Sequence, residues 1–304
     1  MRDRFANTFY QLGKEDERLA VIVADISPAG SIAKFREEFP DRFINTGVAE
    51  QVMIGIAAGM ALRGMRPFAY TIATFALFRP FEMVRLDLGY QNLPVTVVGI
   101  GGGVSYSTLG GTHHAMEDVA VASVIPNMQV VAPCDPDEVD LMTRYLAKES
   151  LRPTYMRLGK AGEPTLTANA EAFFFGRLRY IQRGSDVCIL SYGPAVKEAL
   201  EIASSLSKSG KSVSVVSVHT IKPLDRTGIE DALRSHPHVV VIEEHVPHGG
   251  LGSRVKEIAW DMKAGCRLDH FSLQDDFIHS YGSHDSLLEC HAMSKGQILE
   301  KISS

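Results

Sequence analysis

Short apolar runs alternate along the first half of the chain with longer segments in which apolar residues recur every three or four positions. The apolar runs predict strands at residues 19–26, 67–74, 93–102, 127–133 and 152–159. The segments between them predict helices at residues 48–62, 79–92, 116–125 and 134–148. Strands that alternate with helices pair in parallel, so this half predicts a doubly wound α/β sheet.

Local start and stop signals support these elements. Asp135 is a natural N-cap, Pro136 stands at the first helical position, and Glu138 completes a capping box. Gly64 follows the 48–62 segment and marks the end of that helix. A turn is expected after the first strand at residues 27–30, which read Ser-Pro-Ala-Gly.

The alternation pauses at residues 159–176 and then restarts. The second half predicts strands at residues 186–193, 213–221, 238–245 and 267–273, and helices at residues 195–210, 229–236 and 253–264. We therefore expect two doubly wound α/β domains. The first covers residues 1–165, a linker covers 166–180, and a smaller domain covers 181–304.

Composition narrows the class of protein. The chain has 304 residues, 45% hydrophobic and 22% charged, which suits a globular protein of roughly two domains. Its net charge is −5, and no basic stripe or tail favours nucleic acid or an anionic membrane. The first residues are too charged for a signal peptide, and no apolar run spans a bilayer, so a cytoplasmic location is expected. The four cysteines lie far apart, which predicts neither a zinc knuckle nor a disulfide framework.

Glu50 is a lone acidic residue at the head of an otherwise small and apolar helical segment, GVAEQVMIGIAAGMALRG. A carboxylate in the first turn of a helix is stabilised by the helix macrodipole, so Glu50 could simply favour the helix start. The segment alone does not separate that role from a chemical one.

A glycine-rich stretch, GIGGGVSYSTLGGTHH, follows the predicted strand at residues 93–102. Its glycines lie at the carboxyl end of a parallel strand, where open α/β sheets bind ligands. Two adjacent histidines, His113 and His114, close the stretch, and they could either cap a helix or transfer protons.

Three aromatic residues, Phe75, Phe78 and Phe81, recur at a spacing of three in TFALFRPF. Such a stripe usually packs into the core. Because it follows the end of a strand, it could also present an aromatic face to a flat ligand.

Four histidines, His236, His238, His245 and His248, surround the last but one predicted strand. They lack the spacing of a metal-binding helix and have no matching carboxylates. We expect exposed loop histidines here rather than a metal site.

Taken together, the segments TGVAEQVMIGIAAGMALRGMRPFAYTIATFALF, GGTHHAMEDVAVASVIPNMQVVAPCDPDEV and RPTYMRLG resemble the pyrimidine-binding domain of the transketolase family of thiamine diphosphate enzymes. The later segments IKPLD and VVVIEEHVPHGGLGS are similar to the C-terminal domain of that family. The resemblance covers nearly the whole chain in order, and GVAEQ is its most specific element.

The resemblance implies roles for the residues that handle the cofactor. Glu50 would hydrogen-bond a ring nitrogen of the aminopyrimidine and so promote deprotonation of the thiazolium carbon, chemistry that the cofactor supplies and the protein tunes. Phe78 would stack on the aminopyrimidine, with Phe75 and Phe81 as walls of its pocket.

The resemblance also implies residues that handle the substrate. His113 matches the active-site histidine that assists proton transfer, and His114 stands where the family more often has glutamine. Arg157 matches an arginine that contacts substrate phosphate, and Asp25 matches an aspartate near the substrate channel.

Departures from the family pattern bear on the substrate. Where the family has a phosphate-binding histidine, this sequence has the glycine run around Gly101. Where the family has an aspartate that reads sugar hydroxyls, this sequence has Leu109. These differences favour a modified or deoxy sugar, or a different binding mode of the loop. Deoxyxylulose phosphate synthases have an arginine at the position that Phe78 occupies in this sequence. The phenylalanine therefore favours a transketolase over such a synthase.

The diphosphate-binding motif of the family is absent. The family holds the cofactor diphosphate through Mg²⁺ bound by a GDG motif, and no GDG occurs in this sequence. The resemblance therefore implies a separate alpha-type chain that supplies the magnesium ligands and shares the cofactor, with an α2β2 assembly expected. The chain itself is then expected to hold no metal.

Three functions stay open at this point. The leading one is the beta-type subunit of a split transketolase that transfers a two-carbon ketol unit from a ketose to an aldose. The alternatives are a 2-oxo acid dehydrogenase beta subunit or deoxyxylulose phosphate synthase-like enzyme, and a non-catalytic α/β scaffold.

Overall fold

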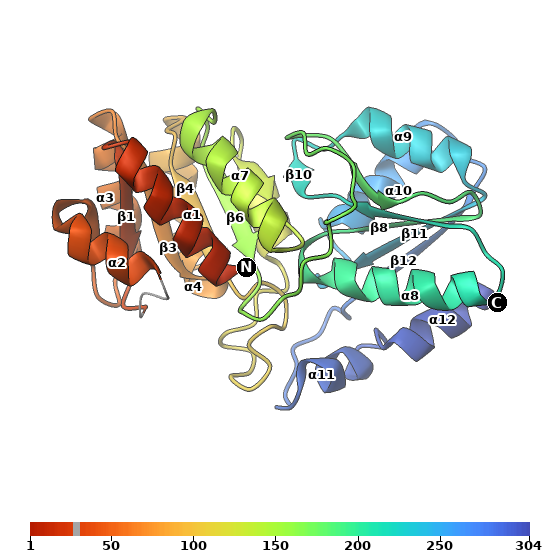
Figure 1. Ribbon diagram of the computed structural model, residues 1–304. Coiled ribbons are helices and arrows are strands. Elements are labelled where there is room, and N and C mark those ends of the chain that lie inside the picture. The colour runs from red at the N-terminus through yellow and green to blue at the C-terminus, as the bar shows by residue number, and fades with distance from the viewer. Residues whose placement is uncertain (27–30) are drawn as a thin grey trace.

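The computed structural model describes residues 1–26 and 31–304, and the turn predicted at residues 27–30 lies outside this part. Two α/β units, each a sheet covered by helices, lie side by side, with the N-terminal half on the left and the C-terminal half on the right of Figure 1. The α/β class and the division into two wound sheets agree with the sequence prediction. Among the described residues, no helix combines the length and the apolar character needed to cross a membrane.

The sheet of the first half has seven strands in the order β10-β5-β6-β4-β3-β1-β2. Its strands are β1 (Leu19–Val23), β2 (Phe43–Asn45), β3 (Arg66–Ile72), β4 (Thr96–Ile100), β5 (Gln129–Val131), β6 (Thr154–Leu158) and β10 (Thr220–Lys222). Strand β10 pairs antiparallel with β5, and the other pairings are parallel. Every residue of β1, β4 and β6 is buried, as a parallel sheet covered on both faces requires.

Helices cover both faces of this sheet. One face carries α1 (Arg2–Glu15), α2 (Ser31–Glu38) and α7 (Pro136–Lys148), whose buried side chains form one core cluster with the strands. The other face carries α3 (Glu50–Leu62), α4 (Ala73–Leu77), α5 (Phe81–Met83), the π-helical turn η2 (Val84–Tyr90) and α6 (Asp118–Ser123). A short 3-10 turn, η1 (Pro40–Arg42), precedes β2.

The sheet of the second half has five strands in the order β12-β11-β8-β9-β7. Its strands are β7 (Arg179–Gln182), β8 (Val187–Ser191), β9 (Val213–Ser217), β11 (His238–Glu243) and β12 (Arg267–Ser272). Strand β7 pairs antiparallel with β9, and the other pairings are parallel. The helical elements of this half are η3 (Gly193–Ala195), α8 (Val196–Lys208), α9 (Arg226–Ser235), α10 (Leu251–Asp261), α11 (His284–Cys290) and α12 (Lys295–Ser303).

The strand predicted at residues 213–221 is in fact two strands in two different sheets. Residues of β9 lie inside the second sheet, whereas β10 crosses over and pairs with β5 at the edge of the first sheet. The backbone N–H of Ala132 also donates to the carbonyl of His219 (2.8 Å), and this bond holds the residues just before β10 against the first sheet. Periodicity could not reveal the break, because both pieces are apolar and largely buried.

The two halves share a core. One cluster of buried side chains includes residues of α3 and α6 from the first half and of β8, α9 and α10 from the second. Residues 159–178 run between β6 and β7 without helix or strand. This shared cluster joins the two halves, and the domain boundaries at 165 and 181 stay a prediction.

Several elements differ from the sequence prediction. The helix predicted at residues 79–92 is formed by α5 and, directly after it, the π-helical η2, and Pro80 separates this helical segment from α4. Helices α1, α2, α11 and α12 were not predicted. The N-cap of α7 is as predicted, since the Asp135 side chain accepts from the Glu138 N–H. The predicted capping box does not form, because the Glu138 side chain accepts the backbone N–H of Cys134 instead of that of Asp135.

Candidate active site

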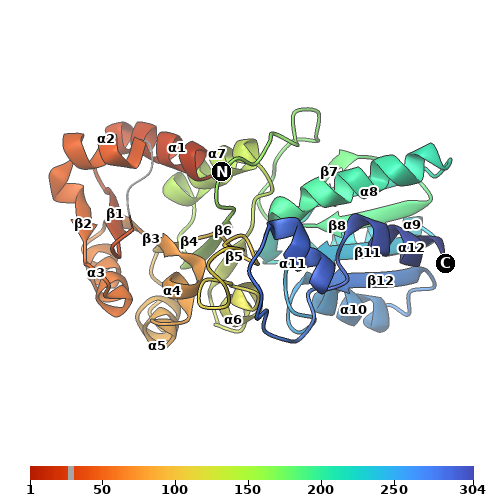
Figure 2. The same cartoon turned by 90° about the horizontal axis from the view of Figure 1, so that it is seen from below.

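The candidate site lies where β2, β3 and β4 end. The chain enters α3 after β2, α4 after β3, and a loop of residues 101–117 after β4. Figure 2 shows α3, α4 and this loop along one edge of the first half. Carboxyl ends of neighbouring parallel strands form one edge of a sheet, so residues far apart in the sequence meet there.

Glu50 is the first residue of α3 and is 3% exposed. Its Oε1 lies 2.9 Å from Nη1 of Arg79, which comes from the turn between α4 and α5. A buried carboxylate requires a partner, and Arg79 supplies one from a side chain that is itself 44% exposed. The carboxylate is therefore held by a cation that can move into solvent.

Arg79 also lies over the ring of Phe75, with 4.0 Å between the guanidinium carbon and the ring centroid. That ring and the His113 ring meet in a T-shaped arrangement with 5.2 Å between their centroids. Glu50, Arg79, Phe75 and His113 thus form one continuous row. Arg79 was not among the residues predicted from the sequence; the available signal was a lone cation inside an aromatic motif.

The other two aromatic residues take a different position from Phe75. Phe78 and Phe81 are partly buried and pack against the core cluster to which α3 contributes. Part of the stripe therefore packs into the core, whereas Phe75 contacts Arg79 and His113. The cofactor contacts of Phe75, Phe78 and Phe81 stay a prediction.

His113 is half-buried in the loop after β4. Its Nδ1 lies 2.9 Å from the hydroxyl of Thr112, and its ring also approaches Tyr106 at 6.0 Å between centroids. Burial, and then the Arg79 guanidinium, lower the pKa of His113 below its usual value. The ring is consequently neutral at pH 7 and able to accept a proton.

His114 is 5% exposed. Within the described part of the chain, neither of its ring nitrogens has a hydrogen-bond partner, and burial lowers its pKa. Its carbonyl accepts a hydrogen bond from the Thr74 hydroxyl (2.9 Å), which ties the loop to α4. The substrate contact expected for His114 stays a prediction.

Arg157 occupies the interior rather than an open edge. It is 2% exposed, its Nε donates to Asp118 (3.0 Å), and its Nη2 donates to the carbonyl of Glu244 (2.9 Å). Desolvation opposes its charge, but the nearby carboxylate of Asp118 and other groups raise its pKa, so it stays ionised. These contacts join the two halves, and a phosphate contact at Arg157 remains a prediction without support from its surroundings.

Asp25 is exposed just after β1 and has a positive φ of 46°. Its backbone N–H donates to the side chain of Asn45 (3.1 Å). Asn45 ends β2, so Asp25 lies at the same edge of the sheet as Glu50. Its place near a substrate channel stays a prediction.

The four histidines of the second half do not converge. His236 bonds Ser214, His238 pairs with Asp269, and His245 bonds a backbone carbonyl. The expectation of exposed loop histidines was wrong for His236 and His245, which are 6% and 0% exposed. Burial at strand ends, which the spacing does not reveal, accounts for the difference.

Comparisons with known proteins agree with this architecture. The pyrimidine-binding domain of transketolase matches residues 1–162, and the transketolase C-terminal domain matches residues 176–298. A putative transketolase C-terminal section from Methanocaldococcus jannaschii is 35% identical, covering 99% of this chain and 95% of that protein. One of the subunits of the apulose-4-phosphate transketolase of Phocaeicola vulgatus is 30% identical, covering 93% of this chain and 90% of that subunit.

A solved structure is similar along the whole chain. It is a split gene transketolase in the form of an inactive beta4 tetramer, with a TM-score of 0.86, 32% identity, and coverage of 99% of this chain and 96% of that one. These matches confirm the resemblance carried by the GVAEQ and GGTHH segments. The chain belongs to the transketolase family.

Proposed function

We propose that this chain is the C-terminal, beta-type subunit of a two-chain transketolase that transfers a two-carbon ketol unit from a ketose donor to an aldehyde acceptor. The observation that carries the proposal is the row formed by Glu50, Arg79, Phe75 and His113 at the carboxyl edge of the first sheet. Relatives of nearly the same length are transketolase subunits, which supports the same activity here.

The residues present fit the aminopyrimidine of thiamine diphosphate. Glu50 is a buried carboxylate whose cationic partner is exposed enough to leave, and an aromatic face adjoins it. Thiamine diphosphate, when bound, supplies the nucleophilic carbon for attack on the donor carbonyl. Glu50 would hold a ring nitrogen by a hydrogen bond made in a water-poor site, where such bonds are strong.

The aromatic side chains would position the cofactor ring. Phe78 would stack on the aminopyrimidine, with Phe75 and Phe81 as walls of its pocket. Phe75 already presents a face to a planar cation, the Arg79 guanidinium, so it can line such a pocket. Phe78 and Phe81 are partly buried and pack against the core, which holds their rings in place. Rigid support from the core limits the orientations that a bound ring can adopt.

His113 would exchange protons with substrate hydroxyl and carbonyl groups. It is neutral at pH 7, lies beside Phe75, and is carried by a loop at the site edge. A positioned general acid or base contributes about 10²- to 10⁴-fold to a rate. We propose substrate contacts for His114, whose ring nitrogens have no partner among the described residues, and for Asp25, which is exposed. A substrate phosphate at Arg157 would have to displace Asp118 or the carbonyl of Glu244.

The exposed face of α3 supports a separate partner chain. Val52 and Leu62 on this helix are 52% and 62% exposed, and added Cβ atoms at Gly55 and Gly59 would meet nothing of the described residues within 4 Å. Helices that are apolar on all sides are normally buried, so another chain would cover this face. We propose an alpha-type chain that carries the GDG motif and the Mg²⁺ ligands, in an α2β2 assembly.

The sugar is proposed to be modified. Leu109, which stands where the family has a hydroxyl-reading aspartate, is 46% exposed on the loop that carries His113, and its side chain has no hydrogen-bonding group. A relative with 30% identity is named for apulose 4-phosphate. We propose a ketose that lacks a hydroxyl, or carries a substituent, at the carbon facing Leu109.

Calorimetry tests the proposal. Thiamine diphosphate with Mg²⁺ is titrated into this chain alone, into a GDG-containing candidate partner alone, and into the mixture, followed by assays of ketol transfer from simple ketoses. Binding confined to the mixture and lost in Glu50→Ala is the expected result. Activity on a 2-oxo acid in place of a ketose would favour the dehydrogenase alternative, and no binding in any mixture would favour a scaffold.

A further inference from the structure

Strand β11 leads into two consecutive carboxylates with different surroundings. Glu243 accepts two backbone N–H groups at the start of α10, both at 2.8 Å. Glu244 instead reaches into the first half. Each carboxylate pairs with a histidine at 2.8 Å, Glu243 with His270 and Glu244 with His284.

Glu244 contacts the loop that carries His113. Its Oε2 accepts the backbone N–H of Val104 (3.2 Å). Gly103 has a φ of +65°, and a Cβ there would overlap the Glu244 carboxylate and the Arg157 guanidinium. The loop therefore fits tightly against these groups.

The same chain segment also binds the far end of the loop. The backbone N–H of Val246 donates to the carbonyl of Met116 (3.0 Å), and the N–H of Ala120 donates to Nε2 of His245 (3.2 Å). Residues 244–246 thus contact the loop at its start, near Val104, and at its end, near Met116. The histidine that faces the active site lies between these two attachments.

A second segment of the C-terminal half packs on the tip of the loop. The ring of Tyr281 lies against Gly110, so closely that a Cβ at Gly110 would overlap it. Figure 2 shows the segment that precedes α11 beside this loop. Residues of the first half alone do not define the loop position.

We propose that Glu244, held by His284, is a positioning residue that fixes the 101–117 loop and thereby sets the distance of His113 from the reacting groups. The C-terminal half then takes part in the reaction through this contact and not only as packing. The catalytic consequence rests on the proposed function; the contact between Glu244 and the loop does not.

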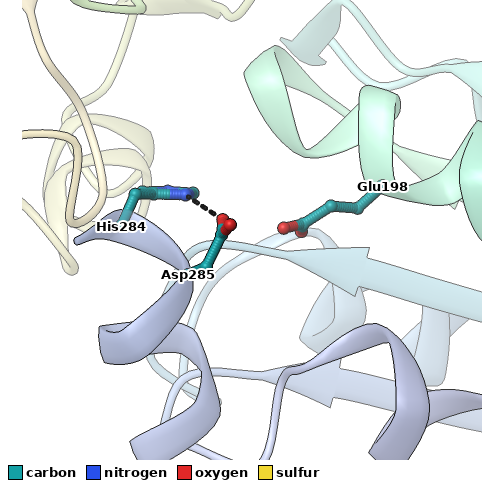
Figure 3. Close-up of side chains that lie close together, drawn as sticks. All are labelled: Glu198, His284 and Asp285. Carbon is teal, nitrogen blue, oxygen red and sulfur yellow. Dashed lines mark ion pairs between the residues drawn. The ribbon is translucent and has the colours of Figure 1, made fainter.

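Titratable groups from three elements face His284. Glu244 follows β11, Glu198 comes from α8, and Asp285 from α11 lies 3.8 Å from Nδ1 of His284. Burial raises the pKa of Glu198 to about 8, so this side chain is largely protonated at pH 7. Figure 3 shows the Asp285 and Glu198 carboxylates pointing toward each other, with the His284 ring beside Asp285. Arg157 lies near Glu244 and favours its ionised form.

The Glu244–His284 pair is ionised at neutral pH. The charge of Glu244 raises the pKa of His284 to about 9. Burial opposes ionisation of Glu244, but His284 and Arg157 hold its pKa below the usual value. A cavity of about 300 Å³, lined by Ser105 and His284 among others, borders the pair.

Amide hydrogen exchange of the full chain tests the contact without partner or cofactor. We expect Glu244→Ala to speed exchange over residues 101–117 by about tenfold or more, the loss for one hydrogen bond to a charged group. Glu244→Gln keeps an acceptor oxygen and should restore part of the protection. His284→Gln keeps a donor without charge, should give an intermediate rate, and serves if the alanine variant does not fold.

Glu243→Gln is the matched control. It removes the charge of the neighbouring buried carboxylate, which also pairs with a histidine, so exchange should rise at the start of α10 and stay unchanged over residues 101–117. A folded Glu244→Ala chain in which amide exchange over residues 101–117 is unchanged would overturn the proposal. A Glu243→Gln chain in which exchange over these residues rises as much as in Glu244→Ala would overturn it as well.

Kinetics of the chain assembled with its partner test the catalytic consequence. Misplacement of a proton-transfer group by about 1 Å can cost up to 10²-fold in rate, so kcat of Glu244→Gln should fall about 10- to 100-fold with KM nearly unchanged. In wild type, the alkaline limb of the pH profile should follow His284 near pH 9, and His284→Gln should remove it. Faster amide exchange over residues 101–117 in Glu244→Ala, together with a wild-type assembly that shows no ketol transfer, would uphold the contact and reject the proposed function. Faster exchange over this loop in Glu244→Gln with an unchanged kcat would overturn the positioning role.

Discussion

Glu50 and Glu244 are both nearly fully buried carboxylates, 3% and 4% exposed, yet they are held in opposite ways. Among the described residues, Glu50 has one ion-pair partner, the exposed side chain of Arg79. Glu244 is held by His284 and the Val104 N–H, which come from two different elements. A carboxylate whose counter-ion can leave is available to an incoming group, whereas one bound from several sides is part of the fold.

The two carboxylates predict opposite mutational signatures. Changes at Glu50 should act on activity with little effect on stability. Changes at Glu244 should act on stability and on the position of the loop. Variants at the two sites, and at the groups that hold them, distinguish these outcomes.

Glu50→Gln should have the largest effect. It keeps the volume and removes the negative charge, so ketol transfer by the assembled enzyme should fall about 10²- to 10⁴-fold. The urea midpoint of the isolated chain should change little, because the partner, Arg79, can turn into solvent. A Glu50→Gln chain that is less stable yet still active would contradict this prediction, because it would show that Glu50 stabilises the fold and does not act in the reaction.

His113→Gln should lower kcat by about 10²-fold, since it removes a group that exchanges protons. It leaves Phe75 and Arg79 in place, so thiamine diphosphate affinity measured by calorimetry should stay near that of the wild type. An equal loss of affinity would show that His113 acts in cofactor binding instead.

Glu244→Ala should destabilise the chain by about 1–3 kcal/mol, the cost of leaving buried groups without their charged partner. Glu50→Ala should cost less, because its partner is exposed. Equilibrium unfolding in urea, with equal m-values checked for both variants, measures the difference. Equal losses would remove the distinction between the two sites.

The stability that His284 provides should depend on pH with a defined sign. Its pKa is raised to about 9 in the folded chain from an ordinary value near 6.5, so its contribution is full below about pH 6.5. That contribution is lost as the pH rises through about 9. Partial exposure of His284 limits the effect to about 1 kcal/mol or less, measured as wild type minus His284→Gln across about pH 6–10.

Arg79→Ala should have the smallest effect. Removing a partly exposed ion pair worth about 0.2–1 kcal/mol should tighten thiamine diphosphate binding by up to about fivefold, because Glu50 no longer has a counter-ion to displace. The pKa of His113 should rise in the same variant, since a nearby positive charge is gone. Weaker binding would indicate that Arg79 itself contacts the cofactor.

Much of the site was predictable from local sequence. Glu50 heads α3 as its position in GVAEQ indicates, and His113 lies on the glycine loop after β4. The alternation of strands and helices likewise predicted both wound sheets. These features depend on local hydrogen bonding and on a periodic apolar pattern, both of which a short window contains.

Long-range contacts were not predictable. Nothing near Arg157 in sequence indicates that Asp118 and Glu244 surround it, so its burial was unexpected. Arg79 was overlooked because its partner is a distant residue, Glu50. The crossing of β10 to the first sheet likewise depends on pairing with β5, far away in the chain.

The two α/β halves, the family, and the positions of Glu50 and His113 at the carboxyl edge of the first sheet follow from the amino-acid sequence alone. The folded chain was needed to reveal that Glu244 and His284 of the second half hold the loop of the first, and that Glu50 rests against a removable cation. The physical reason is that helices and strands follow from neighbours along the chain. A buried charge, by contrast, takes its partner from whichever element the folded core brings beside it.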